Sequence, residues 1–120
     1  MKKESSQEKA ERVKQKLREK VPEEKLNWKE GLSTGSTLLN LACSGRPEVG
    51  YLQGTYVFLV GDSVAGKTVE AHTALAEAAN NPEFDEYQLV YDDPEDGSLM
   101  NREKMFGKKL AQRIKPPGAD

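Results

Sequence analysis

The apolar residues of this chain are most concentrated in its middle third. Residues 55–60, Thr-Tyr-Val-Phe-Leu-Val, are β-branched, aromatic or aliphatic throughout, and they predict a β-strand. Residues 69–79 predict a helix, which Asn80-Asn81-Pro82 ends. A second strand is predicted at residues 88–91, after the acidic stretch 84–87. The helix residues expected to face the sheet are Ala71, Leu75, Ala78 and Ala79.

A thin apolar stripe runs through the charged N-terminal part of the chain. Ser5 or Ser6 can cap a helix there, Glu8 lies near its first turn, and Pro22 ends it. Residues 1–26 hold nine Lys or Arg against six Glu, so the helix is either solvated and fraying or an arm that docks on a neighbouring subunit. The stripe consists of Ala10, Val13, Leu17 and Val21.

Residues 27–54 form an approach segment before the first strand. Trp28 is expected to anchor a linker by packing. Residues 32–45 predict a turn and a short helix, with Ser33, Thr34 or Ser36 as its N-cap and Gly45 as its C-cap. Cys43 is expected to be a small core residue. The apolar face of this helix is predicted to contain Leu38, Leu41 and Ala42.

The C-terminal part predicts one more helix, over residues 98–110, with a break at Gly107. Leu99, Met105 and Phe106 are expected to point inward. Residues 112–120 are basic and then proline-rich, and they predict a loop without a closing element.

Composition limits the class of protein. With 120 residues the chain has the length of one modest domain, and 32% of its residues are charged. One cysteine excludes an intrachain disulfide. No apolar run approaches the roughly 20 residues of a membrane span, so we expect a soluble, cytoplasmic protein. The net charge of −2 argues neither for nor against nucleic acid as a partner.

The most specific motif lies between the first predicted strand and its helix. Residues 61–68, Gly-Asp-Ser-Val-Ala-Gly-Lys-Thr, match G-x-x-x-x-G-K-[ST], the phosphate-binding P-loop, in the strand–loop–helix setting that it requires. Its glycines let backbone N–H groups surround an anion at a helix N-terminus. The alternative is a glycine turn that only caps a helix. The expected nucleotide-binding residues are Gly61, Asp62, Ser63, Val64, Ala65, Gly66, Lys67 and Thr68.

The motif assigns roles to its last two residues. Lys67 is expected to reach the β- and γ-phosphates of ATP, and the Thr68 hydroxyl to bind Mg²⁺. His72, one helical turn later, is expected to be a helix-surface residue rather than a catalytic group.

A carboxylate cluster follows the second predicted strand. Residues 92–97, Asp-Asp-Pro-Glu-Asp-Gly, stand where catalytic groups occur in open α/β sheets, at the carboxyl end of a strand. Such a cluster can orient a water or support magnesium. An acidic turn of ordinary turn-forming residues explains the same spacing.

These features together resemble the N-terminal part of a RecA-type recombinase, and most closely the RecA-like ATPases found in phages. The resemblance covers roughly residues 32–110 and is carried by 32–36 with 39–42, by 61–68 and by 91–95. It implies an α/β fold, a P-loop NTPase of RecA-like type with an incomplete sheet. The implied organisation is a charged N-terminal helix or arm (1–26), a linker and approach segment (27–54) and a partial ATPase core (55–120).

The resemblance also implies a catalytic pair. Glu95, in Asp93-Pro94-Glu95, matches the glutamate that activates water in the family, and Lys67 acts on the phosphates. Pro94 departs from the family pattern, and Asp92 offers an alignment one residue earlier. The family's strand with the magnesium-binding aspartate of the Walker B motif has no counterpart here. In the family, further strands lie between the two strands predicted here, so we expect a gap in the sheet and a truncated chain.

Two functions from different classes fit these residues. One is a Mg²⁺-dependent ATPase, part of a DNA recombinase that forms a homo-oligomeric filament or ring and contacts single-stranded DNA through other regions. The other is a nucleotide-binding assembly or regulatory module that does not hydrolyse. A helicase or clock-type ATPase with the same core fold is a further alternative. The basic residues Lys108, Lys109, Arg113 and Lys115 are expected to form only a solvated face.

Overall fold

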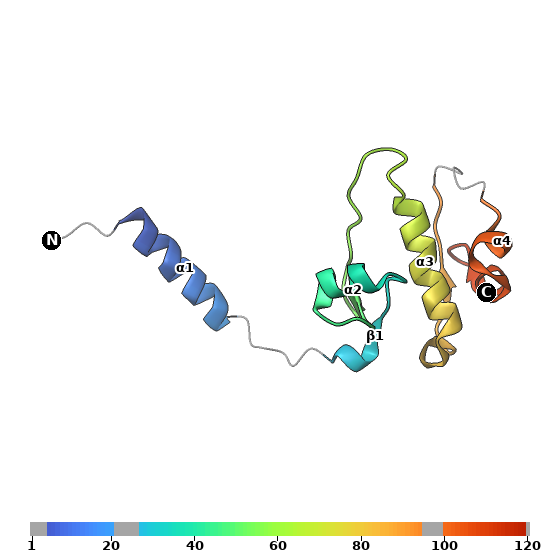
Figure 1. Ribbon diagram of the computed structural model, residues 1–120, viewed down its shortest axis with the longest axis horizontal. Helices are drawn as coiled ribbons and strands as arrows, with labels where there is room; N and C mark the ends of the chain where they lie inside the picture. The colour runs from blue at the N-terminus through green and yellow to red at the C-terminus, as the bar shows by residue number, and fades with distance from the viewer. Residues whose placement is uncertain (1–4, 21–26, 95–99, 120) are drawn as a thin grey trace.

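The computed structural model describes residues 5–20, 27–94 and 100–119. These residues form helices and two separate two-stranded sheets. In Figure 1, α3 stands between the region of α2 and β1 on one side and α4 on the other. The α-helices are α1 (Ser6–Lys20), α2 (Thr37–Ser44), α3 (Lys67–Asn80), α4 (Arg102–Phe106) and α5 (Lys108–Arg113). The 3-10 helices are η1 (Trp28–Glu30) and η2 (Pro82–Phe84). The strands are β1 (Gly31–Leu32), β2 (Tyr51–Leu52), β3 (Leu89–Val90) and β4 (Ile114–Lys115).

Helix α1 begins with a capping box. The Ser5 hydroxyl accepts a hydrogen bond from Glu8 N–H at 3.2 Å, and the Glu8 carboxylate accepts one from Ser5 N–H at 2.8 Å. This confirms the predicted start. Ala10 and Val13 of the predicted stripe are exposed, and α1 stands apart from the other elements in Figure 1. Val21 and Pro22, and the side chain of Leu17, lie outside the described residues.

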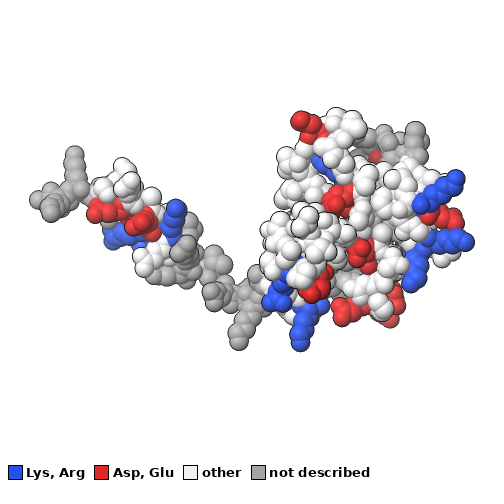
Figure 2. All heavy atoms as spheres, in the orientation of Figure 1, with Lys and Arg blue, Asp and Glu red and all other residues white. Residues whose placement is uncertain are grey.

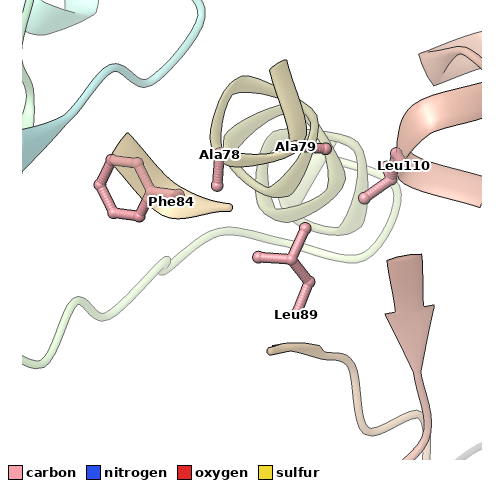
Figure 3. Packing of buried hydrophobic residues seen from close by; sticks show 5 residues of the cluster. All are labelled: Ala78, Ala79, Phe84, Leu89 and Leu110. Atoms are coloured by element: carbon pink, nitrogen blue, oxygen red, sulfur yellow. The ribbon is translucent and has the colours of Figure 1, made fainter. Parts of the chain in front are cut away.

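The apolar core lies around the C-terminal half of α3 (Figure 3). Ala78 and Ala79 are buried there, and their small side chains let other elements approach closely. Strand β3 pairs in parallel with β4, with Leu89 opposite Ile114 and Val90 opposite Lys115. The prediction of a loop over 112–120 is therefore wrong at β4, because a two-residue strand leaves no pattern in the sequence. The buried core residues are Ala78, Ala79, Phe84, Leu89 and Leu110.

The segment 55–60 does not form the predicted strand. It runs unpaired from β2 to the loop before α3 (Figure 1), and Tyr56, Phe58 and Val60 are 93%, 86% and 94% exposed. A strand needs a hydrogen-bonded neighbour, and β3 pairs with β4 instead of with this segment. In the described part of the chain the two predicted strands are thus not neighbours.

The approach segment has the predicted caps but not the predicted core. The Ser36 hydroxyl caps α2 by accepting from Leu39 N–H at 3.3 Å, and Gly45 ends it in the left-handed conformation at φ 73°. Leu38 is 80% exposed, against prediction, and Leu41, Ala42 and Cys43 are exposed too.

The buried side of α2 is polar. Asn40 accepts hydrogen bonds from Thr34 N–H (2.9 Å) and Thr34 Oγ1 (2.7 Å). It donates to Ser33 Oγ (3.0 Å) and Pro47 O (2.9 Å). These bonds use both the oxygen and the nitrogen of the Asn40 side-chain amide. Asn40 can therefore be buried, at 2% exposure. This network, rather than leucine packing, orients α2.

The predicted break at Gly107 is confirmed. Gly107 has φ 91° and ψ 164°, ends α4 and precedes α5. Phe106 packs against the core as predicted, whereas Met105 is 54% exposed, against prediction. Leu99 lies outside the described residues.

Candidate functional site

The motif residues form a loop that leads directly into α3. Gly66 is the N-cap at φ 95°, a conformation that favours glycine, and no side chain caps this helix. The first helical hydrogen bond runs from Glu70 N–H to Gly66 O at 2.9 Å. The N–H groups of Lys67, Thr68 and Val69 are therefore left without a partner within the described chain. Such uncapped N–H groups at the positive end of a helix dipole are suited to an anion.

The loop itself is a tight backbone turn. Ala65 N–H donates to Asp62 O at 3.1 Å, and Val64 has φ 67°. A β-branched residue rarely adopts this left-handed conformation, and turns of this kind form backbone concavities that bind anions. Residues 61–66 are exposed, so the loop is open to a solute.

Lys67 folds back over this loop. Its ammonium group donates hydrogen bonds to Gly61 O and, at 3.0 Å, to Asp62 O. The side chain thus holds its charge beside the uncapped start of α3. An ammonium group makes charge-assisted hydrogen bonds of the same kind with phosphate oxygens.

Thr68 lies in the first turn of α3. Its side chain is exposed, and within the described residues its hydroxyl makes no hydrogen bond. A free hydroxyl oxygen is a ligand type that Mg²⁺ accepts, with phosphate oxygens and water completing the coordination. The described residues contain no group of three or more His, Cys, Asp or Glu placed to hold a metal. Thr68 therefore fits magnesium by ligand type, as one ligand beside a bound phosphate.

The carboxyl end of β3 points toward the same end of α3 as the loop. In Figure 1 the chain leaving β3 rises beside α3 toward the level of residues 61–66. Asp92 is exposed there and Asp93 is half-buried. The predicted base, Glu95, lies outside the described residues.

His72 is not the surface residue that the sequence predicts. It is 0% exposed, and both its ring nitrogens have partners: Nδ1 lies 2.8 Å from Thr68 O, and Nε2 accepts from Arg102 Nε at 3.1 Å. The rings of Tyr91 and Phe106 pack against it at centroid distances of 4.3 and 5.4 Å. His72 stands three and seven residues before Leu75 and Ala79, so the helical spacing does place it on their face of α3. Its ring and guanidinium partners left no such signal, because they follow β3 or lie in α4.

A second contact missed by sequence reasoning ties α3 to β2. The Tyr51 hydroxyl donates to Glu70 Oε1 at 3.1 Å. Burial, and then the hydrogen bond to the Glu70 carboxylate, raise the pKa of Tyr51 from 10.0 to about 12. The first turn of α3 is thereby joined to the sheet that precedes segment 55–60.

The basic residues near the C-terminus do not all belong to a solvated face. Lys108 and Lys109 are exposed as predicted, but Arg113 is half-buried and donates to backbone carbonyls. On the face shown in Figure 2, Lys and Arg side chains are interspersed with Asp and Glu. Such mixing gives no single basic patch on that face.

No family model, no curated protein and no solved structure matches this chain. Among the described helices, none is both long and apolar enough to cross a membrane.

Proposed function

We propose that this chain binds a nucleoside triphosphate, with ATP and Mg²⁺ as its ligands, at residues 61–68. The observation that supports this most is the uncapped start of α3 inside a complete P-loop motif. The N–H groups of Lys67, Thr68 and Val69 have no partner within the described residues, and the Lys67 ammonium group lies against the carbonyls of the same loop. The lysine and the threonine that follow these glycines are the residue types that the nucleotide-binding motif adds to a glycine turn.

Different groups of the loop would bind different parts of the nucleotide. Backbone N–H groups would hold phosphate oxygens, Lys67 would neutralise charge on the β- and γ-phosphates, and Thr68 would hold the metal. Magnesium, when bound, supplies further charge neutralisation at the phosphates. On the RecA-like resemblance, Glu95 would orient the attacking water for in-line hydrolysis.

The wider proposal is that the chain is part of a RecA-like α/β ATPase. Segment 55–60 supports this in one respect: it leads into the loop and is apolar, as a central strand would be. On the resemblance, ATP would lie at an interface within a cytoplasmic homo-oligomer, and single-stranded DNA would contact other regions.

A second candidate function is nucleotide binding without hydrolysis. The described residues contain no group of three or more His, Cys, Asp or Glu placed to hold a metal, so Thr68 is the one magnesium ligand that the motif assigns among them. Phosphate release separates the two functions. Turnover of ATP by the full chain supports the ATPase, and binding without release supports the non-hydrolysing module.

The binding proposal is tested with the alanine variant of Lys67. A fluorescent ATP analogue with Mg²⁺ is titrated into the wild-type chain and into Lys67→Ala. Loss of charge-assisted hydrogen bonds worth about 1.5–3 kcal/mol should weaken binding about tenfold or more.

Lys109→Ala is the matched control, because Lys109 is an exposed lysine on α5. It should bind as the wild type does. Equal affinity of Lys67→Ala and wild type, or no binding by the wild type, would show that the loop is not a nucleotide site.

A further inference from the structure

We propose that His72 is a positioning residue for Thr68, and that it links the magnesium ligand to helix α4. The inference rests on the proposed function of residues 61–68 and adds to it a residue outside the motif. Four contacts carry it: one to Thr68, one to Arg102 and two to aromatic rings.

The first step establishes which ring nitrogen of His72 carries the proton. Arg102 Nε–H lies 3.1 Å from His72 Nε2, and a guanidinium group can donate but never accept. His72 Nε2 must therefore be the accepting nitrogen, and the ring proton is on Nδ1. That proton points to Thr68 O, which lies 2.8 Å from Nδ1. Arg102 thus selects the tautomer that lets His72 donate to Thr68.

The second step is the orientation of the ring. Tyr91 lies at 4.3 Å with an interplanar angle of 51°, and Phe106 is stacked at 5.4 Å and 24°. The Arg102 guanidinium lies over the Tyr91 ring, 5.6 Å from its centroid. With the ring fully buried among these groups, it cannot turn away from Thr68 without disturbing α4 and Tyr91, the residue after β3.

The third step is the effect on Thr68. The helix already directs the backbone N–H of residue 72 to Thr68 O, so the imidazole adds a second donor to the same carbonyl. Two donors fix the plane of the peptide after Thr68, and with it the Cα–Cβ direction from which the Thr68 hydroxyl extends. Partners hydrogen-bonded to metal-ligating side chains commonly change metal affinity by 10–100-fold when they are removed, and for a partner on the ligand's backbone we take the low end of this range.

The test compares nucleotide affinity with and without Mg²⁺. A positioning role acts through Thr68, so it changes the gain in affinity that Mg²⁺ provides. A merely structural role weakens binding equally in Mg²⁺ and in chelator. For His72→Phe, which keeps an aromatic ring but no donor, we expect the Mg²⁺-dependent gain to fall about tenfold.

Two further variants separate the two hydrogen bonds of His72. His72→Asn keeps a donor near the position of Nδ1, and we expect it to keep most of the gain. His72→Gln keeps an acceptor near the position of Nε2, and we expect it to lose the gain as His72→Phe does. In a Thr68→Ala background, His72→Phe should cause no further loss of the gain. The comparison of His72→Asn with His72→Gln tests the role of His72 even if circular dichroism shows that His72→Phe does not fold.

A second measurement needs no ligand. His72 is the one histidine of the sequence, so its ring nitrogens give unambiguous NMR signals in the full chain. We expect the Nδ1–H tautomer in the wild type, and loss of this preference in Arg102→Leu.

The outcomes separate this proposal from the one on which it rests. If the wild type binds no nucleotide, the function of the loop is wrong. If it binds nucleotide with a Mg²⁺-dependent gain that His72→Phe leaves unchanged, or if the free protein has the Nε2–H tautomer, the role of His72 is wrong. The role of His72 is also wrong if Thr68→Ala leaves the Mg²⁺-dependent gain in nucleotide affinity unchanged.

Discussion

Tyr51 shows how one side chain joins two parts of the molecule. Its hydroxyl bonds the Glu70 carboxylate, which lies on the first turn of α3 beside the nucleotide loop. The hydrogen bond holds the Glu70 carboxylate of α3 against the β1–β2 sheet. Because burial and this hydrogen bond favour the protonated phenol, the pKa of Tyr51 rises to about 12.

We predict that tyrosinate absorbance of the folded chain shows one group titrating near pH 12, above the ordinary value of 10.0. Tyr51→Phe should remove this step, and Glu70→Gln should lower the pKa of Tyr51. Tyr56→Phe is the control, because Tyr56 is 93% exposed. A titration unchanged by Tyr51→Phe would contradict the assignment.

The same shift predicts a dependence of stability on pH. The folded pKa of Tyr51 is above its unfolded value, so the contribution is complete below pH 10 and is lost as pH rises toward about 12. The wild type should therefore lose more resistance to urea over this range than Tyr51→Phe does.

At the scale of elements, Arg113 holds the end of α3 in place. From α5 it donates to Ala79 O (3.3 Å), Phe84 O (2.6 Å) and Tyr87 O (3.0 Å), and Asp85 Oδ1 lies 3.7 Å away. Carbonyls at a helix C-terminus lack helical partners, and a cation there also complements the helix dipole. One guanidinium thus joins α5 to α3 and to the turn after it.

We predict that Arg113→Met destabilises this region by about 2 kcal/mol, because four carbonyls, including Asp85 O at 3.4 Å, lose a charged donor while the apolar stem is kept. Amide hydrogen exchange at Phe84, Asp85 and Tyr87, whose N–H groups form turn hydrogen bonds, measures the effect. Lys109→Met, on the exposed part of α5, should leave this exchange unchanged. Equal exchange in both variants would mean that Arg113 contributes little.

At the scale of the whole molecule, little apolar surface is buried. Five hydrophobic residues make the core of the described chain, while Tyr56, Phe58 and Val60 of the segment before the loop are almost fully exposed. Ordering the backbone of each residue costs about 1–2 kcal/mol of free energy through lost conformational entropy. The burial of so few apolar residues offsets only a small part of this cost.

We therefore predict that residues 1–120, as an isolated polypeptide, unfold over a broad temperature range without a sharp calorimetric peak. Adding the ATP analogue with Mg²⁺ should raise the midpoint, since a ligand that binds the folded state stabilises it. A single cooperative transition in the ligand-free chain would contradict the prediction.

The sequence by itself determined several helix boundaries, although α4 begins at Arg102 and not at the predicted residue 98. Ser36, Gly45 and Gly107 act through hydrogen bonds and dihedral angles within a few residues, so their roles follow from local chemistry. The P-loop motif likewise predicted a helix directly after the loop, and α3 begins at Lys67, two residues before the predicted start.

Only the tertiary structure decided which residues are buried and which strands pair. Asn40 and His72 are polar, and their burial depends on partners that no periodicity encodes, such as Pro47 O and Arg102. Segment 55–60 has the composition of a strand but no neighbour, whereas β4 has a neighbour and almost no pattern. Strand pairing and buried hydrogen bonds join residues far apart in the chain, so they are settled by packing and not by local sequence.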